Sequence, residues 1–238
     1  KAVSNLDVVT ADLQSAVMKT RMQPIKKVFG RFPRLVRDLA RSLKKEINLE
    51  LVGEETDLDK NLVEALADPL VHLVRNAVDH GIETPEEREA AGKPRTGKVV
   101  LSAEQEGDHI LLLITDDGKG MDADVLRAKA VEKGLLDKDA ADRLSDLESY
   151  NLIFAPGFST KTEISDVSGR GVGMDVVKNA VQALGGRVSI TSTQGKGTTF
   201  TIVLPLTLAV MDGFVISVSD QTMVIPISSI LETIRPNP

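Results

Sequence analysis

The sequence predicts an α+β protein, a two-layer sandwich in which helices cover one face of a mixed sheet. The order along the chain is helices, two strands, helices and two strands, which is typical of such a sandwich. Lys98–Ala103 and His109–Thr115 alternate as paired strands around a polar turn. Gly186–Thr193 and Thr198–Leu204 form a second pair around Gly195-Lys196-Gly197. The composition agrees, because 42% hydrophobic and 27% charged residues over 238 positions are ordinary for a globular chain.

The composition also excludes several classes of protein. The chain has no cysteine, which excludes a disulfide framework and a thiolate metal site. Only 3% of the residues are aromatic and none is Trp, so we expect no platform for stacking bases and no nucleic-acid partner. No apolar run approaches the roughly 20 residues of a membrane span, so we expect no membrane insertion and a cytoplasmic location. Residue 1 is Lys, and we expect the chain to come from inside a longer protein.

The net charge of −6 is distributed unevenly. The segment from Lys19 to Lys45 has ten basic residues and one acidic residue, whereas the remainder has 19 basic and 34 acidic residues. Such a segment could bind nucleic acid, or it could be a solvated helix face that also touches an acidic neighbour. The second interpretation is favoured, because an apolar stripe runs through the same segment and leaves the charges on the outer face: Leu35, Val36, Leu39 and Leu43.

The first predicted helix covers residues 5–21. Its stripe of Leu6, Thr10, Leu13 and Val17 has the four-three-four spacing of a helical bundle. No earlier helix exists in this chain, so we expect the stripe to pack against another chain or a missing segment. Pro24 follows this helix.

The elements up to the first strand pair follow from caps and periodicity. We expect a helix from Pro33 to Lys45, a strand at Ile47–Val52, and a helix that begins at Asp59 or Asn61 and runs through Leu66. Asp68-Pro69 has the pattern of an N-cap followed by proline at the first helical position, which predicts a new helix that ends at Gly81. Thr84-Pro85-Glu86-Glu87 is a capping box.

The second half of the chain is predicted in the same way. The expected elements are helices at Asp122–Lys133 and Asp137–Ser149, a mobile loop at 155–173, a helix at Gly173–Leu184, and short strands at Val210–Val218 and Gln221–Pro226. The last two strands predict the start of a small β domain that the chain cuts off.

The first candidate for chemistry is a helix face that carries His72, Asn76 and His80 at positions i, i+4 and i+8. An Asn carbonyl can ligate Mg²⁺ while a His handles a proton or a phosphate oxygen. Zinc fits poorly, because the two histidines are two turns apart without a third strong ligand between them. The alternative is an ordinary solvated helix face.

The second candidate is Asp116-Asp117-Gly118-Lys119-Gly120, which follows an apolar strand. A carboxylate at the end of a strand can accept a hydrogen bond from an adenine amino group. The two glycines would let the backbone approach a flat base. The alternative is a plain Asp-Gly turn.

The third candidate is Gly169-Arg170-Gly171-Val172-Gly173-Met174 at the start of a helix. Backbone N–H groups and the helix N-terminus suit a phosphate there. A dinucleotide fingerprint would need glycine at 174 and a preceding strand, and both are missing. Gly195-Lys196 is not a P-loop either, because Gly197 stands where Ser or Thr should follow the lysine.

Taken together and in this order, the motifs resemble the ATPase family shared by gyrase, Hsp90, histidine kinases and MutL. Three segments are similar to chemotaxis histidine kinases of the CheA type, and the resemblance runs through essentially the whole chain. The segments are Asp68–Glu83, Phe154–Lys161 and Ser168–Val177. The resemblance implies a Bergerat-type ATP-binding fold, which is preceded by a helix and followed by the start of an SH3-like β domain.

The resemblance also implies ATP and Mg²⁺ as cofactors, with Asn76 as the Mg²⁺ ligand and His72 and Asn76 as catalytic residues. His72 stands where gyrase-type enzymes carry a water-activating Glu, which favours transfer to a protein acceptor over hydrolysis. The resemblance further implies an ATP site made of Arg75, Asp79, His80, Asp116, Gly118, Gly120, Met121, Lys129, Lys133, Ser159, Thr160, Lys161, Gly169, Arg170, Gly171, Val172, Gly173, Met174 and Thr198. Lys129 and Lys133 could instead be ordinary solvated lysines.

The same resemblance implies a division into domains and a set of partners. Residues 1–22 would end a dimerisation hairpin, 23–206 would form the catalytic domain, and 207–238 would begin a CheW-like regulatory domain. The implied reaction is transfer of the γ-phosphoryl group of MgATP to a histidine on a separate acceptor domain and then to an aspartate of CheY- or CheB-type response regulators. A CheW-like adaptor and chemoreceptors would dock on the regulatory domain. We expect a homodimer in the full-length protein and weakened dimerisation in this chain.

Two other functions remain as alternatives. A gyrase- or MutL-type ATPase switch would need Glu at position 72, where the sequence has His. A signalling scaffold with a decayed nucleotide site would be expected to lack Asn76, Asp116 or the loop glycines, and all are present.

Overall fold

The computed structural model describes residues 2–158, 173–206, 213–218 and 221–226. The chain divides into two compact units, residues 1–206 and 207–238. The first unit carries the sandwich, and each unit is described by itself. Most of the loop predicted at 155–173 lies outside the described residues.

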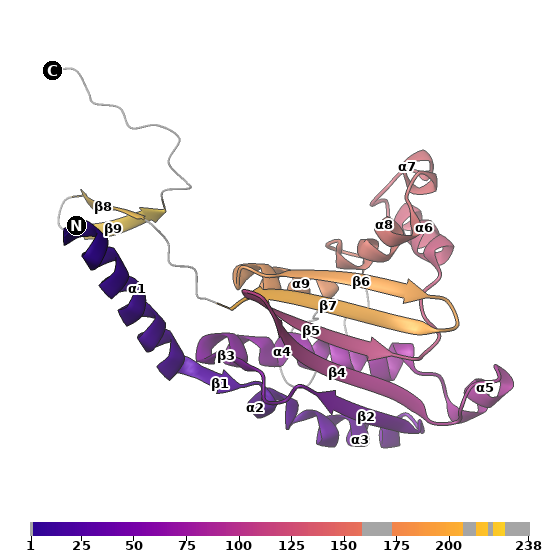
Figure 1. Cartoon of the computed structure of the whole chain (residues 1–238). Helices are drawn as coiled ribbons and strands as arrows, with labels where there is room; N and C mark the ends of the chain where they lie inside the picture. Colours follow the sequence, from indigo (N-terminus) through magenta and orange to yellow (C-terminus); the bar gives the residue numbers. More distant parts are fainter. Residues whose placement is uncertain (1, 159–172, 207–212, 219–220, 227–238) are drawn as a thin grey trace. The chain divides into compact units, whose positions relative to one another are not determined.

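The first unit is built on a five-stranded sheet with the strand order β2-β4-β5-β7-β6 (Figure 1). The strands are β2 (Ile47–Val52), β4 (Gly97–Glu106), β5 (His109–Asp116), β6 (Arg187–Thr193) and β7 (Gly197–Pro205). Strand β2 runs parallel to β4, and the other neighbours are antiparallel. The predicted mixed sheet and both predicted strand pairs are confirmed.

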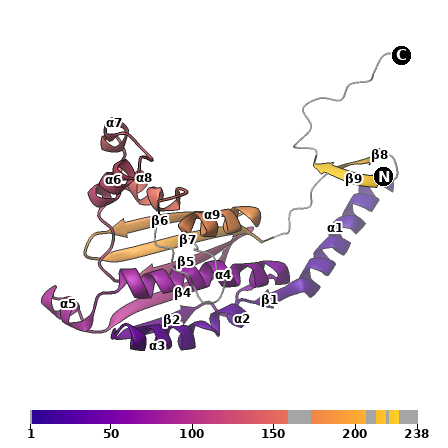
Figure 2. The ribbon, with the colours of Figure 1, turned by 180° about the vertical axis from the view of Figure 1, so that it is seen from behind.

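Helices cover one face of this sheet, as predicted. Figure 2 shows them in front of the strands: α2 (Lys26–Phe29), α3 (Phe32–Ser42), α4 (Lys60–Asn76) and α9 (Met174–Ala183). Every second residue of the central strands points into the layer between helices and sheet, where Ile110, Leu112 and Ile114 of β5 are buried. Helix α4 supplies the opposite wall of the core with Leu62, Leu66, Leu70, Leu73 and Val74.

The predicted break at Asp68-Pro69 is wrong, because α4 is one continuous helix from Lys60 to Asn76 that contains Pro69. A proline inside a helix loses one backbone hydrogen bond and strains the preceding turn. Here Pro69 is itself buried, and the helix packs into the core on both sides of it through Leu66 and Leu70. That burial offsets the local cost. Asp59 caps the helix by accepting a hydrogen bond from the Asn61 backbone N–H, so the first of the two predicted starts is confirmed.

The predicted helix at Asp137–Ser149 is also wrong, because two short helices replace it: α7 (Lys138–Asp142) and α8 (Asp146–Asn151). Ser145 starts the second one with a capping box that includes Glu148. The same device begins α5 (Pro85–Ala90) at Thr84, as predicted. Helix α6 (Ala123–Glu132) and a 3-10 turn, η2 (Leu152–Phe154), complete this region.

Two short strands were not predicted. β1 (Met22–Pro24) pairs antiparallel with β3 (Asp57–Asp59). They bring the end of α1 (Ala2–Arg21) to the start of α4, where Arg21 Nε lies 3.3 Å from Asp59 Oδ2. Short pairings of this kind depend on the fold and carry little local signal.

Helix α1 leaves four of its described apolar side chains exposed. Val8, Val9, Leu13 and Val17 are 51–65% exposed, which agrees with a stripe that has no covering element among the described residues of this unit. Across the helices of the described residues, none is long and apolar enough to cross a membrane.

The second unit is described only at its hairpin. β8 (Gly213–Val218) pairs antiparallel with β9 (Gln221–Pro226), as predicted for two short strands. The predicted first strand begins at Val210, and its residues 210–212 lie outside the described residues.

Candidate nucleotide site

Asp116 ends β5 with a buried carboxyl group. Its side chain is 5% exposed, and its Oδ1 accepts a hydrogen bond from the Gly118 backbone N–H at 2.9 Å. Thr198 of β7 pairs with Asp116 across the sheet and is also buried. Burial raises the pKa of Asp116 to about 6, although hydrogen bonds from the backbone of Gly118 and Thr198 act in the opposite direction. A carboxyl group kept in this environment is a candidate recognition group.

The two glycines of the turn after Asp116 have no room for a Cβ atom. A Cβ atom at Gly118 would lie 2.0 Å from the carbonyl oxygen of Gly81, and the Lys119 N–H donates to that same oxygen at 2.9 Å. Gly120 has φ of +67°, and a Cβ there would lie 2.2 Å from the carbonyl oxygen of Thr193. Gly81, which follows α4 along the chain, therefore lies in direct contact with the turn after β5.

A network of hydroxyl groups continues the site toward β6 and β7. Ser192 Oγ accepts a hydrogen bond from the Met121 N–H at 2.9 Å and lies 3.0 Å from Thr198 Oγ1. Ser192 also donates to the Gly197 carbonyl at 3.0 Å. Thr198 thus lies opposite Asp116 and is connected to Met121 through Ser192, and the predicted contact of these residues with a nucleotide stays a prediction.

The last turn before Gly81 is π-helical (η1, Ala77–Gly81). Lys45 reaches this turn from the segment after α3, and its Nζ donates to the carbonyl oxygens of Val78 at 2.8 Å and Asp79 at 2.6 Å. Burial lowers the pKa of Lys45 despite the nearby Asp79 carboxylate. A π-turn frees backbone carbonyls and is frequent at functional sites, and here a lysine satisfies two of them. His80 is exposed at the end of the turn, with Nε2 3.6 Å from Asp79 Oδ2.

Asn76 connects the helix to the end of the glycine-rich segment. Its Nδ2 donates to the sulfur of Met174 at 3.1 Å. Because a thioether sulfur has no proton to donate, the contact turns the amide nitrogen toward Met174 and leaves Oδ1 for another partner. His72 and Arg75 are half-buried on the same helix.

Lys129 and Lys133 contact Phe158. Their Nζ atoms lie 5.1 and 5.9 Å from the centre of its ring, and Lys133 donates to the carbonyl oxygens of Gly157 and Phe158. These contacts give both lysines a structural role, so their expected approach to phosphates stays a prediction. The remaining predicted residues lie outside the described residues: Ser159, Thr160, Lys161, Gly169, Arg170, Gly171 and Val172.

Comparison with known proteins identifies the family. Residues 65–208, which include Asn76, Asp116, Met174 and Thr198, match the family described as histidine kinase-, DNA gyrase B- and HSP90-like ATPase. The chain belongs to this ATPase family. An ATP-binding domain is therefore established for these residues, and the site described above lies within it.

Within this family, the individual proteins to which the chain is similar are of the CheA type, as the motifs indicated. The sensor histidine kinase CheAY of Helicobacter pylori is 54% identical over 235 residues, which are 99% of this chain and 29% of that protein. The chemotaxis protein CheA of Salmonella typhimurium is 51% identical over 94% of this chain and 33% of its own length. The chemotaxis protein CheA of Bacillus subtilis is 48% identical over 98% of this chain and 35% of its own length. The chain thus spans about a third of the length of these curated relatives.

The ATPase site has a donor set that suits Mg²⁺ with phosphate. Within the described ranges, no three His, Asp or Glu side chains come together as a metal cluster. Mg²⁺ takes oxygen ligands and commonly uses few protein groups together with substrate phosphates and water. One amide oxygen, that of Asn76, fits this requirement, whereas a zinc site would need more ligands.

Several side chains around the site were missed by the sequence analysis. In the sequence, Lys45 belongs only to the basic segment and Ser192 only to a predicted strand, and nothing there assigns either residue a role in the site. A cluster of Glu83, Lys93 and Asp117 around the buried Arg88 lies against the turn after Asp116. No spacing rule could find it, because its members come from α5, from the segments before and after α5, and from the residue that follows β5. Among these four residues, only Asp117 belongs to a candidate motif for chemistry, the Asp-Gly motif after β5.

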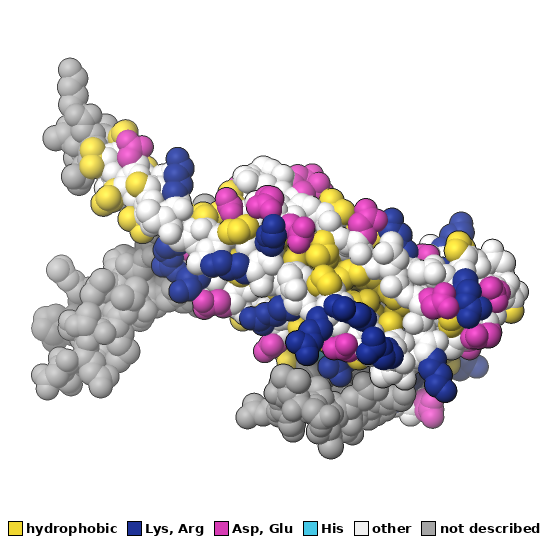
Figure 3. Space-filling view, turned by 90° about the horizontal axis from the view of Figure 1, so that it is seen from below, with side chains coloured by type: hydrophobic (Ala, Val, Ile, Leu, Met, Phe, Trp, Pro, Cys, Tyr) yellow, Lys and Arg dark blue, Asp and Glu magenta, His cyan; other side chains and the backbone are white. Residues whose placement is uncertain are grey.

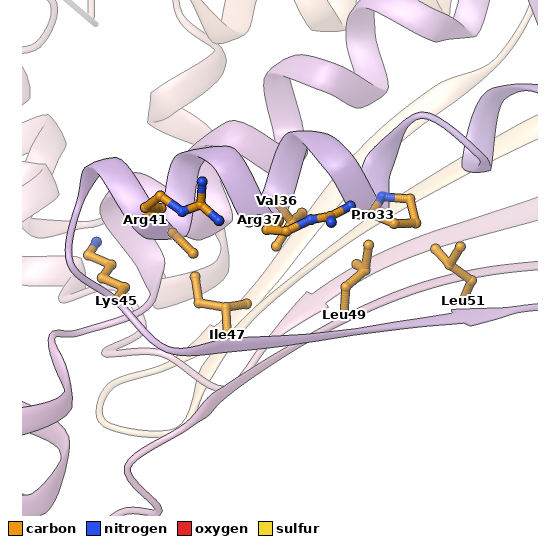
Figure 4. A pocket seen from close by; sticks show the side chains of 9 residues that line it. Pro33, Val36, Arg37, Arg41, Lys45, Ile47, Leu49 and Leu51 are labelled. Carbon is orange, nitrogen blue, oxygen red and sulfur yellow. The ribbon is translucent and has the colours of Figure 1, made fainter.

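The basic segment lines a separate groove between α3 and the edge strand β2 (Figure 4). The groove has a volume of about 410 Å³, and Ile47, Leu49 and Leu51 point from β2 toward α3. Arg37, Arg41 and Lys45 stand beside this apolar floor. Figure 3 views the underside of the molecule, where basic side chains gather beside hydrophobic ones. Neither Asn76 nor Asp116 lines the groove, so it is not the nucleotide site.

Proposed function

We propose that this chain is the ATP-binding catalytic part of a chemotaxis histidine kinase. In this proposal it binds MgATP and transfers the γ-phosphoryl group to a histidine on a separate acceptor domain. The observation that carries the proposal is the buried carboxyl group of Asp116, which lies at the end of a central strand beside a turn in which Gly118 and Gly120 leave the backbone bare. The likeness to CheA proteins along nearly the whole chain supports the choice of kinase over other members of the family.

The adenine amino group would donate to Asp116. Its Oδ1 already accepts from Gly118 N–H, which leaves further lone pairs on the carboxylate for the base. The bare backbone at Gly118 and Gly120 would lie against the ring of the base. Guanine has a carbonyl oxygen in place of the amino group, so the carboxylate would repel it. Asp116 thereby selects adenine.

The phosphates would lie toward Asn76, whose Oδ1 would hold the cation. Mg²⁺, when bound, neutralises charge that develops on the phosphoryl oxygens. His72 and Arg75 lie one turn and one residue before Asn76 on the same helix and would contact the phosphates. The glycine-rich segment that ends at Met174 would supply backbone N–H groups to them.

The proposed transfer breaks the bond between the γ-phosphorus and the β,γ-bridging oxygen and forms a bond from that phosphorus to a nitrogen of the acceptor histidine. ADP leaves with the bridging oxygen, and the acceptor ring loses a proton. We infer that the acceptor belongs to another domain. Two of the three histidines of the chain, His72 and His80, are assigned to the nucleotide site in this proposal, and His109 begins a central strand.

Further proposals concern the longer protein. Residues 1–22 would end a dimerisation hairpin, and 207–238 would begin a CheW-like domain for an adaptor and chemoreceptors. Phosphohistidine would pass its phosphoryl group to an aspartate of response regulators. The location of the protein would be cytoplasmic.

The decisive experiment supplies ATP labelled at the γ-phosphate, Mg²⁺ and a separately purified histidine acceptor domain. We expect label on the acceptor, none on this chain alone, and none with the Asn76→Ala variant. Circular dichroism and thermal melts should show that this variant keeps its fold. Transfer at the wild-type rate by Asn76→Ala would contradict the metal-ligand role, and self-labelling of the chain would contradict the need for a separate acceptor.

A further inference from the structure

Arg88 is a buried cation behind the adenine-binding turn. It comes from α5, its side chain is 1% exposed, and it makes hydrogen bonds in four directions. Nε donates to the Pro94 carbonyl at 2.7 Å, and Nη1 donates to Glu83 Oε2 at 3.0 Å and to the Asp117 carbonyl at 3.1 Å. Nη2 donates to Asp117 Oδ2 at 2.9 Å. Every side of the guanidinium group is therefore used.

Lys93 is the second cation of this cluster. Its Nζ donates to Glu83 Oε1 at 2.6 Å, to the Asp117 carbonyl at 3.2 Å and to the Gly118 carbonyl at 2.7 Å. Two cations thus face two carboxylates, and the cluster is neutral as a whole. Burial would raise the pKa of Glu83, but the hydrogen bond and charge of Lys93 and the charge of Arg88 lower it overall, so the carboxylate stays ionised.

The cluster holds two consecutive peptide groups of the turn. A trans peptide is planar, so its C=O and its N–H point in opposite directions as one rigid unit. In the first unit, Arg88 and Lys93 hold the Asp117 C=O, while the Gly118 N–H donates to Asp116 Oδ1. In the second unit, Lys93 holds the Gly118 C=O, while the Lys119 N–H donates to the Gly81 carbonyl. Each peptide group is fixed at both ends.

This arrangement connects the cluster directly to the carboxyl group of Asp116. The N–H that orients Oδ1 is held from the other end of its peptide group, where the Asp117 C=O accepts from both cations, so the loss of either cation loosens it. Cations on the carbonyl oxygen also polarise the peptide group and strengthen its N–H as a donor. Asp117 itself is fixed on its other side, where Oδ1 accepts from the Lys98 N–H at 2.8 Å.

We propose that Arg88 and Lys93 are positioning residues for adenine recognition, which act by fixing two peptide groups of the turn, the first of which orients the Asp116 carboxylate through the Gly118 N–H. This inference rests on the proposed function, because it requires that Asp116 accepts from adenine. It assigns specificity to residues that do not touch the nucleotide. A cluster that only anchored α5 would affect the stability of the fold and leave base selectivity unchanged.

The test uses Lys93→Met, which keeps the length of the side chain and removes its three donors. The binding of ATP, GTP and inorganic tripolyphosphate is measured by calorimetry with Mg²⁺, below the melting temperature of each variant. We expect the dissociation constant for ATP to rise about tenfold, which is typical for the loss of charged hydrogen bonds. The preference for ATP over GTP should fall, and tripolyphosphate binding should not change. Lys93→Arg should restore part of the preference.

Arg95→Met is the matched control. Arg95 lies two residues further on and forms ion pairs with Glu46 and Glu89, but it has no contact with the turn after Asp116 among the described residues. We expect it to lower stability slightly and to leave ATP binding and base preference as in the wild type. Hydrogen exchange of the Gly118 amide without nucleotide adds a second readout, since Lys93→Met should accelerate it and Arg95→Met should not.

The outcomes separate the two proposals. If the wild type does not bind ATP, the proposed function is wrong and the positioning role is lost with it, whatever the Gly118 exchange shows. If the wild type binds ATP and Lys93→Met has the same affinity and base preference, the positioning role alone is wrong. If Lys93→Met does not fold, Glu83→Gln is the second variant, because it replaces the carboxylate that pairs with Arg88 and Lys93 by a neutral amide. We expect it, too, to lower the preference for ATP over GTP. An unchanged preference in that variant would equally overturn the inference.

Discussion

The side-chain amide of Asn76 donates a hydrogen bond to the sulfur of Met174 across 3.1 Å, although 98 residues separate them. Asn76 ends α4 and Met174 begins α9, so the contact ties the candidate metal ligand to the helix that follows the glycine-rich segment. Met174 is buried and has no proton to donate, which fixes the direction of the amide.

The first prediction concerns this contact. Met174→Leu keeps the volume of the side chain and removes the acceptor, so the Asn76 amide is free to turn. We expect the Mg²⁺ concentration for half-maximal phosphotransfer to rise by about three- to tenfold, which corresponds to a weak hydrogen bond. ADP binding in the absence of Mg²⁺ should not change. Met18→Leu in α1 is the control, and an unchanged Mg²⁺ dependence in Met174→Leu would show that the contact has no orienting role.

The second prediction concerns the pH dependence of stability. The pKa of Asp116 is about 6 in the folded chain, whereas the ordinary pKa of an aspartate side chain is 3.8. The folded state therefore holds the proton more tightly, and this stabilisation is present below pH 3.8 and is lost as the pH rises through 6. The full difference is about 3 kcal/mol. We expect the free energy of unfolding of Asp116→Asn, relative to wild type, to increase by up to that amount from pH 4 to pH 7.

Urea titrations of both proteins at several pH values measure this difference. The same Asn variant should bind ATP more weakly at pH 7, because the amide replaces the carboxylate acceptor. Parallel stability curves for the two proteins would contradict the raised pKa of Asp116. Wild-type ATP affinity in the variant would contradict its role toward adenine.

The third prediction concerns the close approach at Gly118. In Gly118→Ala the new Cβ atom would lie 2.0 Å from the Gly81 carbonyl oxygen, so the turn must move away from α4. Overpacking of this kind costs typically about 1–3 kcal/mol, and we expect a lower melting temperature and ATP binding below detection. Gly107→Ala is a control in the β4–β5 turn, where a Cβ meets nothing within 4 Å, although Gly107, unlike Gly118, has a positive φ of +63°. Equal ATP binding by the two variants would be evidence against the close approach.

The fourth prediction concerns α1. Leu13 and Val17 are exposed at 65% and 51%, and the helix would need a second helix to cover them. We expect a monomer or a weak dimer in sedimentation experiments at micromolar concentration. Leu13→Lys should then leave the sedimentation coefficient of a monomer unchanged and abolish any weak dimer. A dimer that persists at nanomolar concentration would show that α1 pairs by itself.

Much of the site could be predicted from local sequence because its chemistry needs specific residue types at fixed spacings. His72 and Asn76 share a helix face by periodicity alone, and Asp116 with Gly118 and Gly120 forms a strand-end motif. Caps such as that of Thr84 depend on residues three positions apart, so they were also predictable. The mixed sheet follows from alternation in four strands and from the order of the elements.

The tertiary structure decided what depends on partners distant in sequence. Pro69 remains helical because Leu66 and Leu70 beside it are buried in the core. Local helix propensity does not take such tertiary packing into account. Lys45 donates to two carbonyl oxygens of the π-turn, which lie 33 and 34 residues further along the chain. Arg88 and Lys93 donate to Asp117, from which they are 29 and 24 residues distant in sequence. A buried polar group takes whichever partner the fold brings near it. The sequence by itself predicted residues for the nucleotide site, and only the fold decided which other residues hold Asp116 and the π-turn in place.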